Sequence, residues 1–348
     1  MTNASTLRSR IGRAVAFKAL GLVVLAVFAL LIPVIAPDPA TTNIAVFTVM
    51  YVGLATAWNI MGGYTGYISL GHAAFFGIGA YAFGLLLIHL KVTPGYAPFL
   101  LVPLAGLITA VFAVGIGWIA LRTRAATFVI VTIAFMFIVQ LLAENLVKLT
   151  GGGAGLSVPY PRDWTGDFFN TPFYYAMLTL AAIALTVSWS IRRSKFGLGL
   201  LAIRDDEDKA LAVGVPTRAF KLIAFVISAV LVGMIGAVYG YYITYLYPQF
   251  VVDPLLGISM VLMSFLGGLG TLSGPVIGAV LLERAQLEFA YRFGASRLYL
   301  VLFSAVFLVV ILVLPRGIVP SLTDLVHRWR HHTQDDAPAP AKQPVASP

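Results

Sequence analysis

The chain has 348 residues, of which 59% are hydrophobic and 11% are charged, with a net charge of +9 and no cysteine. A soluble domain carries roughly 25% charged residues, so this composition excludes an ordinary globular protein with a water-facing surface. The missing cysteines exclude disulfides and cysteine-ligated metals.

Long apolar segments follow one another along most of the chain. In chain order we predict helices over Val15–Ala36, Asn43–Met61, Ile68–Leu90, Ala97–Leu121, Ala126–Val147, Pro172–Ile191, Ala219–Tyr245, Leu256–Leu266, Pro275–Tyr291 and Leu298–Leu314. Only helices satisfy their own backbone groups within lipid, so the fold class is an all-α polytopic membrane protein. Leu256–Leu266 is too short to cross alone, which predicts a half-helix or re-entrant segment.

The ends of the chain differ in composition from its centre. Residues 1–14 form a predicted tail, 15–315 the membrane domain and 316–348 a basic tail rich in Pro and Ala. The apolar run Leu20–Ala36 continues through Pro33 without a small-residue cleavage site. We therefore interpret it as a retained first helix instead of a signal peptide.

The positive charges arbitrate between nine and ten spans. With about ten spans and an internal N-terminus, 17 of the 23 Lys and Arg residues fall on one side. Joining Leu256 to Tyr291 in a single span would instead place Arg316, Arg328 and Arg330 outside. The bias favours ten spans with both termini in the cytoplasm. The basic charge therefore indicates a lipid bilayer as the partner, and no nucleic acid is expected.

The chain lacks the motifs of an enzyme. No Gly-Lys-Ser or Gly-Lys-Thr phosphate loop and no His-Glu-x-x-His zinc motif occurs. The interiors of the predicted spans are almost free of ionisable residues, which disfavours an ion-coupled secondary transporter. We expect no catalytic residue, metal or cofactor on this chain.

A first glycine-rich segment runs from Asn59 to Tyr81. Its glycines predict a helix break near Gly62–Gly66, after which Ser69 would cap a new helix. A turn followed by a packed helix is an equally weighted alternative. In the functional interpretation, the broken helix lines a solute path and directs its positive end at a carboxylate. The candidate path residues here are Asn59, Gly63, Tyr64, Gly66, Ser69, Gly71 and His72.

A second glycine-rich segment, Ser264–Pro275, resembles the first at an offset of 205 residues, from Gly62 to Gly267. Paired broken helices are typical of transporters built from internal repeats. The candidate path residues here are Gly267, Gly268, Thr271 and Ser273.

The longest charged stretch between spans is 192–217. Asp205 or Asp206 is expected to cap a short helix that ends at Gly214, with Leu211 and Val215 on one face. This pattern favours a surface helix presented to a partner over a solvated loop. A further glycine run, Thr150–Leu156, indicates a flexible linker or a docking face for an external protein.

Four stretches, Gly63–Tyr81, Thr150–Leu156, Phe196–Glu207 and Leu266–Pro275, together resemble the LivM-like permeases of branched-chain amino-acid ABC importers. The resemblance implies a second H-type permease, two cytoplasmic ATPase subunits that hold ATP and Mg²⁺, and a periplasmic binding protein. It also implies that 203–214 is a coupling helix that contacts an ATPase through Arg204, Asp205, Asp206, Glu207, Ala210 and Gly214. Asp208 and Lys209 depart from the small or apolar residues expected there.

The resemblance implies import of leucine, isoleucine and valine. An ABC permease for urea or short amides is the alternative, with an ion-coupled transporter and a membrane enzyme further behind. We also expect that Glu207→Lys uncouples transport without unfolding the chain.

Overall fold

The computed structural model describes residues 27–35, 38–164, 168–293, 301, 305, 308, 312 and 317–323. Residues 1–14, and most of the predicted helices Val15–Ala36 and Leu298–Leu314, lie outside this described part, as does all of the C-terminal tail except 317–323.

Seven stretches of the described chain are long and apolar enough to span a bilayer. They are α2 (Pro39–Thr65), α3 (His72–Leu90), η1 with α4 (Ala97–Leu101 and Val102–Ala120), α5 (Ala125–Asn145), α7 (Asn170–Arg193), α10 (Thr217–Ile243) and α11 with α12 (Pro248–Val251 and Pro254–Gly267). A further long helix, α13 (Gly274–Phe293), follows. The all-α polytopic fold is confirmed, with about ten helices as an approximate count.

The expected half-helix at Leu256–Leu266 is longer than the sequence pattern indicated. Asp253 caps α12 by accepting a hydrogen bond from the Leu255 backbone N–H at 2.9 Å. Pro254 occupies the first turn, where its missing N–H costs nothing. Together α11 and α12 supply a 20-residue apolar stretch, Pro248–Gly267, which is long enough to cross.

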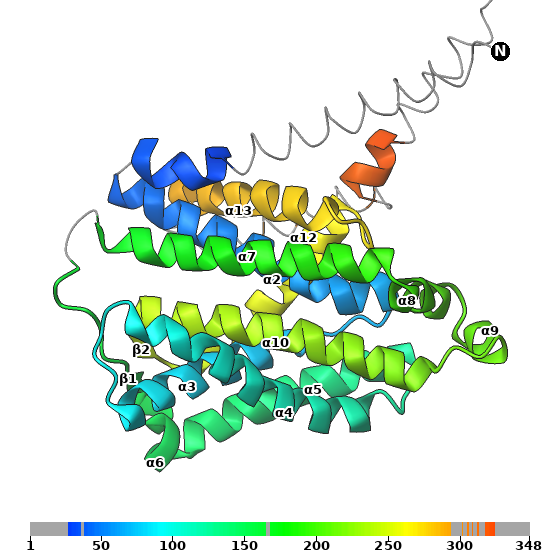
Figure 1. Ribbon diagram of the computed structural model, residues 1–348, viewed down its shortest axis with the longest axis horizontal. Coiled ribbons are helices and arrows are strands. Elements are labelled where there is room, and N and C mark those ends of the chain that lie inside the picture. Colours follow the sequence, from blue (N-terminus) through cyan, green and yellow to red (C-terminus); the bar gives the residue numbers. More distant parts are fainter. Residues whose placement is uncertain are drawn as a thin grey trace, which may run out of the picture.

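The centre of the bundle is formed by α2, α3 and α10 (Figure 1). Helix α10 packs against α3, α4 and α2, and α2 packs against α7, α12 and α13. Small residues let α3 and α10 approach closely: a Cβ on Gly79 would collide with the backbone of Gly233. Most of α2 is buried, whereas only 17% of the apolar window of α5 is, so α4 and α5 present apolar side chains outward.

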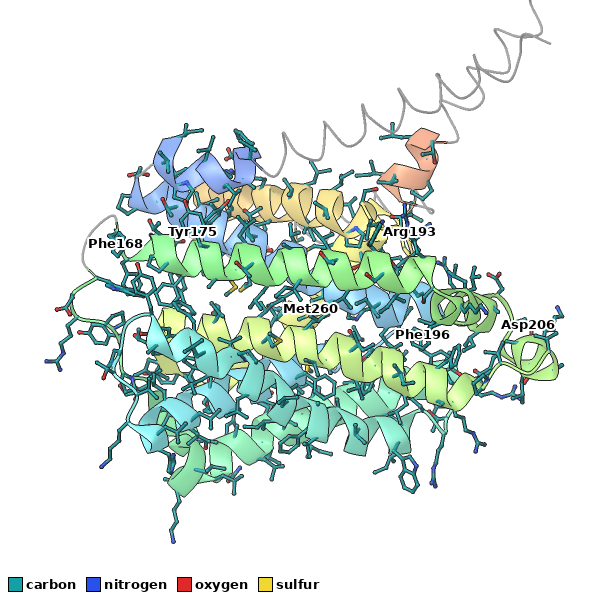
Figure 2. The ribbon with its side chains drawn as sticks, viewed as in Figure 1. Phe168, Tyr175, Arg193, Phe196, Asp206 and Met260 are labelled. Atoms are coloured by element: carbon teal, nitrogen blue, oxygen red, sulfur yellow. The ribbon has the colours of Figure 1, made fainter. Side chains whose placement is uncertain are left out.

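The bundle has two distinct ends (Figure 1). At one end, which we name the β end, β1 (Leu156–Ser157) pairs antiparallel with β2 (Tyr245–Leu246), beside α6 (Val147–Thr150) and η2 (Gly152–Ala154). At the other, which we name the α9 end, α8 (Lys195–Asp205) and α9 (Glu207–Ala212) project from the bundle. Figure 2 shows Asp206 at this edge and Met260 between the helices, where Met260 is fully buried.

Basic residues concentrate at the α9 end. The loops and helix ends there carry Arg122, Arg124, Arg192, Arg193, Lys195, Arg204, Lys209, Arg218 and Lys221. Within the described chain, the β end carries Lys91, Lys148 and Arg162. This unequal distribution of Lys and Arg agrees with the two sides of the membrane to which the sequence pattern assigns these residues.

Candidate functional site

The capped helix predicted in the charged stretch is α9. Asp206 is its N-cap: Oδ1 accepts the Lys209 backbone N–H at 3.0 Å, and Oδ2 lies 2.9 Å from Lys209 Nζ. The backbone hydrogen bond from Lys209 is the main reason that the pKa of Asp206 lies below its usual value. Asp205 ends α8, and Gly214 adopts a positive φ of 90° just beyond α9. Of the two proposed caps, Asp206 is therefore the one that forms.

Helix α9 has an inner and an outer face. Ala210 is 3% exposed and faces the bundle, whereas Leu211 is 59% and Val213 79% exposed. The structure therefore turns Ala210, one of the residues expected to contact an ATPase, into this chain. Leu211 and Val213 are the apolar side chains that α9 and its C-cap leave uncovered.

A three-residue cluster holds α9 against the bundle. Lys221 Nζ lies 2.5 Å from Glu207 Oε1 and donates to Tyr67 Oη at 3.0 Å, and Tyr67 Oη donates to Glu207 Oε2. Burial alone would raise the pKa of Glu207, but the hydrogen bonds from Lys221 and Tyr67 and the positive charge of Lys221 together hold it below its usual value. Burial and the adjacent Glu207 carboxylate raise the pKa of Tyr67. The cluster joins α9 to α10 and to the loop after α2.

Two arginines connect the α8 region to the glycine-rich segments. Arg204 Nη1 donates to the Gly63 carbonyl at 2.8 Å and lies 3.5 Å from the Leu269 carbonyl. Arg192 Nη1 donates to the Gly270 carbonyl at 2.5 Å. Arg204 thus faces the membrane bundle as well as the surface where a partner was expected.

The two glycine-rich segments, 205 residues apart in the sequence, contact each other in the fold. Asn59 Nδ2 donates to the Thr271 carbonyl at 3.0 Å, and the Gly270 N–H donates to Asn59 Oδ1 at 2.9 Å. A Cβ on Gly63 would lie 2.8 Å from the Gly270 nitrogen and collide with Asn59. Asn59 therefore fastens the α12–α13 loop to α2. A contact between the two segments does not test whether they are internal repeats, so the internal repeat stays a prediction.

The first segment breaks within the predicted range Gly62–Gly66, at its last glycine. Helix α2 continues through Gly62, Gly63 and Tyr64 to Thr65, and ends at Gly66, which adopts the left-handed conformation with φ 75°. The next helix begins at His72 with Gly71 as N-cap and no side-chain cap, so the expected capping role of Ser69 is wrong. Helix α2 thus ends at Gly66, whereas the two upstream glycines, Gly62 and Gly63, stay helical and closely packed.

Ser69 instead takes part in a buried relay with His72. His72 Nδ1 lies 2.9 Å from Ser69 Oγ, and Nε2 lies 2.7 Å from Ser228 Oγ, which donates to the Ala57 carbonyl at 2.7 Å. Tyr64 Oη lies 2.8 Å from Ser188 Oγ. These hydrogen bonds join α2, α3, α7 and α10, and they satisfy polar groups that would otherwise be buried without partners.

In the second segment, Thr271 caps α13. Its Oγ1 accepts the Gly274 N–H at 3.0 Å and donates to the Gly268 carbonyl at 2.7 Å. Gly267 and Gly268 are buried, whereas Ser273 is exposed. Most of the proposed path residues are therefore packed inside this conformation, and their role in translocation stays a prediction.

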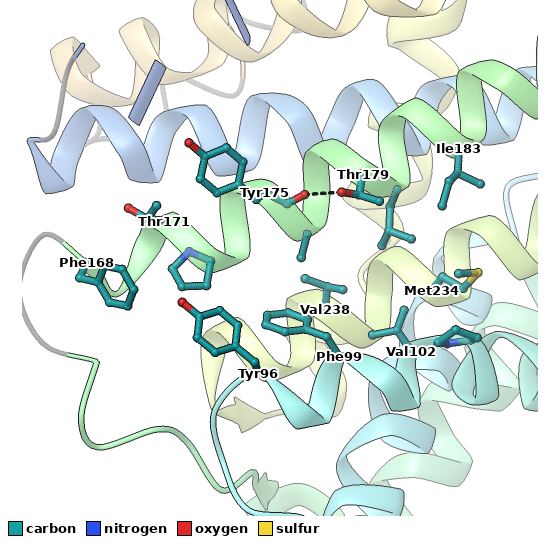
Figure 3. Close-up of a pocket in the computed structure, with 14 residues that line it drawn as sticks. Tyr96, Phe99, Val102, Phe168, Thr171, Tyr175, Thr179, Ile183, Met234 and Val238 are labelled. Carbon is teal, nitrogen blue, oxygen red and sulfur yellow. Dashed lines mark hydrogen bonds between the residues drawn. The ribbon is translucent and has the colours of Figure 1, made fainter. Parts of the chain in front are cut away.

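Two cavities lie near the functional elements. One of about 560 Å³ opens between η1, α4, α7 and α10 and is lined mainly by apolar residues such as Phe99, Phe168, Met234 and Val238 (Figure 3). None of the proposed path residues lines it. Another, of about 470 Å³, lies at the α9 end between α9, the 121–125 loop and the start of α10, and is lined by charged side chains and by Gly66.

Two ionisable residues within helices were not singled out from the sequence. Lys221 lies in α10 and is 2% exposed. Glu283 lies at the middle of α13 and is 4% exposed, and its Oε2 has no hydrogen-bond partner among the described residues, as is also true of Gln286 Oε1 one turn later. A glutamate inside the predicted helix Pro275–Tyr291 was the available signal. The expectation of nearly uncharged spans therefore does not hold for α13, which carries Glu283, Arg284 and Glu288.

Comparisons with known proteins identify a family of transport proteins. A family model described as "Branched-chain amino acid transport system / permease component" matches residues 40–313. The chain is 29% identical over 267 residues to the LivM permease protein of the high-affinity branched-chain amino acid transport system of Escherichia coli K12, covering 70% of this chain and 62% of that relative. It is 26% identical over 290 residues to the corresponding LivH of Salmonella typhimurium LT2, covering 77% and 91%.

A further relative, matched over a shorter part of the chain, is the L-arabinose ABC transporter permease protein AraH of Azospirillum brasilense, 27% identical over 191 residues, covering 53% of this chain and 55% of AraH. The match to LivM spans less than two thirds of the length of LivM. No solved structure matches the chain. The family model covers most of the chain, so the chain belongs to the family of branched-chain amino acid transport system permease components.

Proposed function

We propose that this chain is the membrane-spanning permease subunit of an ATP-driven importer of leucine, isoleucine and valine. Its partners are a second, H-type permease, two cytoplasmic ATPase subunits and a periplasmic binding protein. The family match and the LivM and LivH relatives support the substrate and the permease partner. ATP and Mg²⁺ belong to the ATPase subunits, and this chain binds no cofactor.

The observation that carries the proposal is the connection from α9 to both glycine-rich segments. An ATPase subunit that binds Leu211 and Val213 displaces α9 when it changes conformation. The Glu207–Lys221 ion pair couples this displacement to α10. Arg204 reaches the Gly63 carbonyl, and Asn59 joins α2 to the α12–α13 loop. A displacement of α9 would therefore be transmitted to the helix ends that the sequence predicts to line the solute path.

The α9 end faces the cytoplasm in this proposal. The concentration of Lys and Arg at that end supports this orientation, because basic loops are retained on the cytoplasmic side. Both chain termini are then cytoplasmic, and the membrane is the inner membrane. The β end, with the Thr150–Leu156 segment, faces the binding protein.

The choice of substrate rests on the relatives, which also include the arabinose permease. Urea or short amides are the alternative cargo. An ion-coupled mechanism is favoured by one observation, the buried Glu283 carboxylate within α13, whose Oε2 has no hydrogen-bond partner among the residues that the structure describes.

The direct test of the coupling role uses the outer face of α9. Glu207→Lys is unsuitable, because it would place a second ammonium against the buried Lys221 and disturb the fold. We propose Leu211→Ser with Val213→Ser, and Leu100→Ser at the β end as the control, since Leu100 is 82% exposed. Capture of the purified ATPase subunit should fail for the α9 variant alone. Equal capture by all three proteins would contradict the coupling role.

A further inference from the structure

A small cavity of about 230 Å³ lies between the end of α4 and the start of α10 at the α9 end. Gly117, Leu121 and Leu222 contribute apolar surface to it, and Trp118, Arg122 and Arg218 line it as well. Close packing brings the two helices together here: a Cβ on Gly117 would lie 2.8 Å from Leu222 and from Phe225. The cavity is thus a fixed feature of the α4–α10 contact.

Both guanidinium groups at this cavity are without a carboxylate partner. The ion pairs among the described residues join Lys209 to Asp206 and Lys221 to Glu207, and neither Arg122 nor Arg218 lies within 4 Å of an acidic side chain there. Asp205, Glu207 and Asp208 line the adjoining 470 Å³ cavity, which shares both arginines. The positive charge at the smaller cavity is therefore not neutralised by a direct contact.

Arg122 is held in place by an aromatic ring. Its Cζ lies 3.7 Å from the Trp118 ring centroid, so the guanidinium stacks on the indole. Stacking occupies the face of the guanidinium and leaves its planar N–H donors available to an anion. Trp118 is itself 60% exposed, at the end of a helix that presents apolar side chains outward.

The apolar surface continues from the cavity along α4. Val111, Phe112 and Ile119 are 72%, 51% and 59% exposed, in a helix long and apolar enough to span the bilayer. An occupant therefore meets two cations at the cavity and a hydrocarbon-compatible surface beside it. Tryptophan and arginine at a helix end are typical of the headgroup region.

We propose that the Arg122–Arg218 cavity binds the phosphodiester headgroup of an anionic phospholipid, whose acyl chains lie along the outer face of α4. The two arginines supply the charge-assisted hydrogen bonds, and Trp118 orients Arg122. The lipid is part of the leaflet on the α9 side. This site adds a lipid partner at the base of the α9 region and does not depend on the transported solute.

Native mass spectrometry of the detergent-purified full chain tests the proposal. Dioleoylphosphatidylglycerol is titrated against dioleoylphosphatidylcholine, with free glycerol phosphate as competitor. The variant is Arg122→Gln with Arg218→Gln, and its matched control is Arg193→Gln, because Arg193 stacks on Trp189 in a similar way, with Cζ 4.4 Å from the ring centroid, but does not line the cavity. A thermal melt checks that each variant is folded.

We expect the double variant to weaken phosphatidylglycerol binding about 25-fold, since each basic side chain near an anionic leaflet contributes about a factor of five. Arg193→Gln and phosphatidylcholine binding should be unchanged. An equal loss of phosphatidylglycerol binding in the Arg193→Gln control would show that binding depends on the overall surface charge, and it would overturn the site. Equal binding of both lipids, or displacement by glycerol phosphate at the same concentration as the lipid, would overturn the lipid assignment.

Discussion

Glu207 and Lys221 form an ion pair, with 2.5 Å between Oε1 and Nζ, that joins the first residue of α9 to the second turn of α10. The two partners differ in burial: the Lys221 side chain is 3% exposed and that of Glu207 is 31% exposed. The Lys221 ammonium is almost fully buried, and among the described residues it donates to the Glu207 carboxylate and to Tyr67. The pair therefore fixes α9 more firmly than a surface salt bridge would.

This asymmetry predicts unequal costs for removing the two charges. Glu207→Gln leaves a buried ammonium without its counter-charge and should destabilise the chain by about 2 kcal/mol, reduced from the roughly 3–5 kcal/mol of a fully buried pair because Glu207 is partly hydrated. Lys221→Met leaves a carboxylate that water can reach and should cost less. Thermal melts in detergent measure both. If Lys221→Met is the more damaging change, the assignment of burial is wrong.

The same pair predicts a pH dependence of stability. The pKa of Glu207 is lowered in the folded protein, so its contribution is fully present above the ordinary glutamate pKa of about 4.3 and is lost as pH falls through the lower folded value. Melting temperatures followed between about pH 6 and pH 3 should therefore fall less steeply in the doubly substituted Glu207→Gln, Lys221→Met protein. Identical slopes for the two proteins would refute the linkage.

Asn59 should control the order of the α12–α13 loop. Asn59→Leu removes the hydrogen bonds to Gly270 and Thr271 and leaves their buried groups unsatisfied, a cost of about 2 kcal/mol. Hydrogen exchange should accelerate in residues 268–273 and not in α7. Asn145→Ala is the control, because Asn145 is exposed and bonds to the Leu141 carbonyl within its own helix. Unchanged hydrogen exchange in the α12–α13 loop of the Asn59→Leu variant would show that Asn59 does not hold this loop in place.

Gly63 and Gly115 form a matched pair of helical glycines. A Cβ on Gly63 would meet Asn59 and the Gly270 nitrogen, whereas a Cβ on Gly115 would meet nothing within 4 Å. Gly63→Ala should therefore lower the melting temperature. Gly115→Ala should leave the melting temperature unchanged or raise it slightly, because alanine is favoured over glycine in a helix by ~0.5–1 kcal/mol of stability. Equal effects in both variants would show that α2 and the α12–α13 loop are not in close contact.

Glu283 predicts a gain in stability when its charge is removed. Glu283→Leu removes a buried carboxylate whose Oε2 has no hydrogen-bond partner in the described part of the chain, so the isolated chain should be stabilised by about 1–3 kcal/mol and melt at a higher temperature. The control is Leu282→Ala, at the buried apolar neighbour, which should destabilise because it leaves a cavity. A lower melting temperature for Glu283→Leu would show that the carboxylate is bonded.

The sequence predicts helix positions well in the segments that cross the lipid bilayer. Apolar length alone locates α3, α5, α7 and α10 to within a few residues, because a spanning segment must satisfy its own backbone. The cap of α9 is narrowed to Asp205 or Asp206 because a polar residue before a short charged helix has a local signature, and the structure shows that Asp206 is the cap.

Contacts between distant segments are not encoded in such local patterns. The bond from Asn59 to Gly270 joins residues 211 positions apart, and no periodicity indicates it. Ser69 was expected to cap a helix, because the sequence does not show that Ser69 and Ser228 both reach the ring of His72 in the core. The burial of Lys221 likewise depends on where α9 folds back.

Transport by the reconstituted assembly tests the central claim most directly. The chain is placed in proteoliposomes with its permease partner, the ATPase subunits and the binding protein, and uptake of leucine and of urea is measured with and without ATP. We predict ATP-dependent leucine uptake that Leu211→Ser with Val213→Ser abolishes and Leu100→Ser does not. Uptake of leucine by this chain alone, driven by a proton gradient without ATP, would contradict the account.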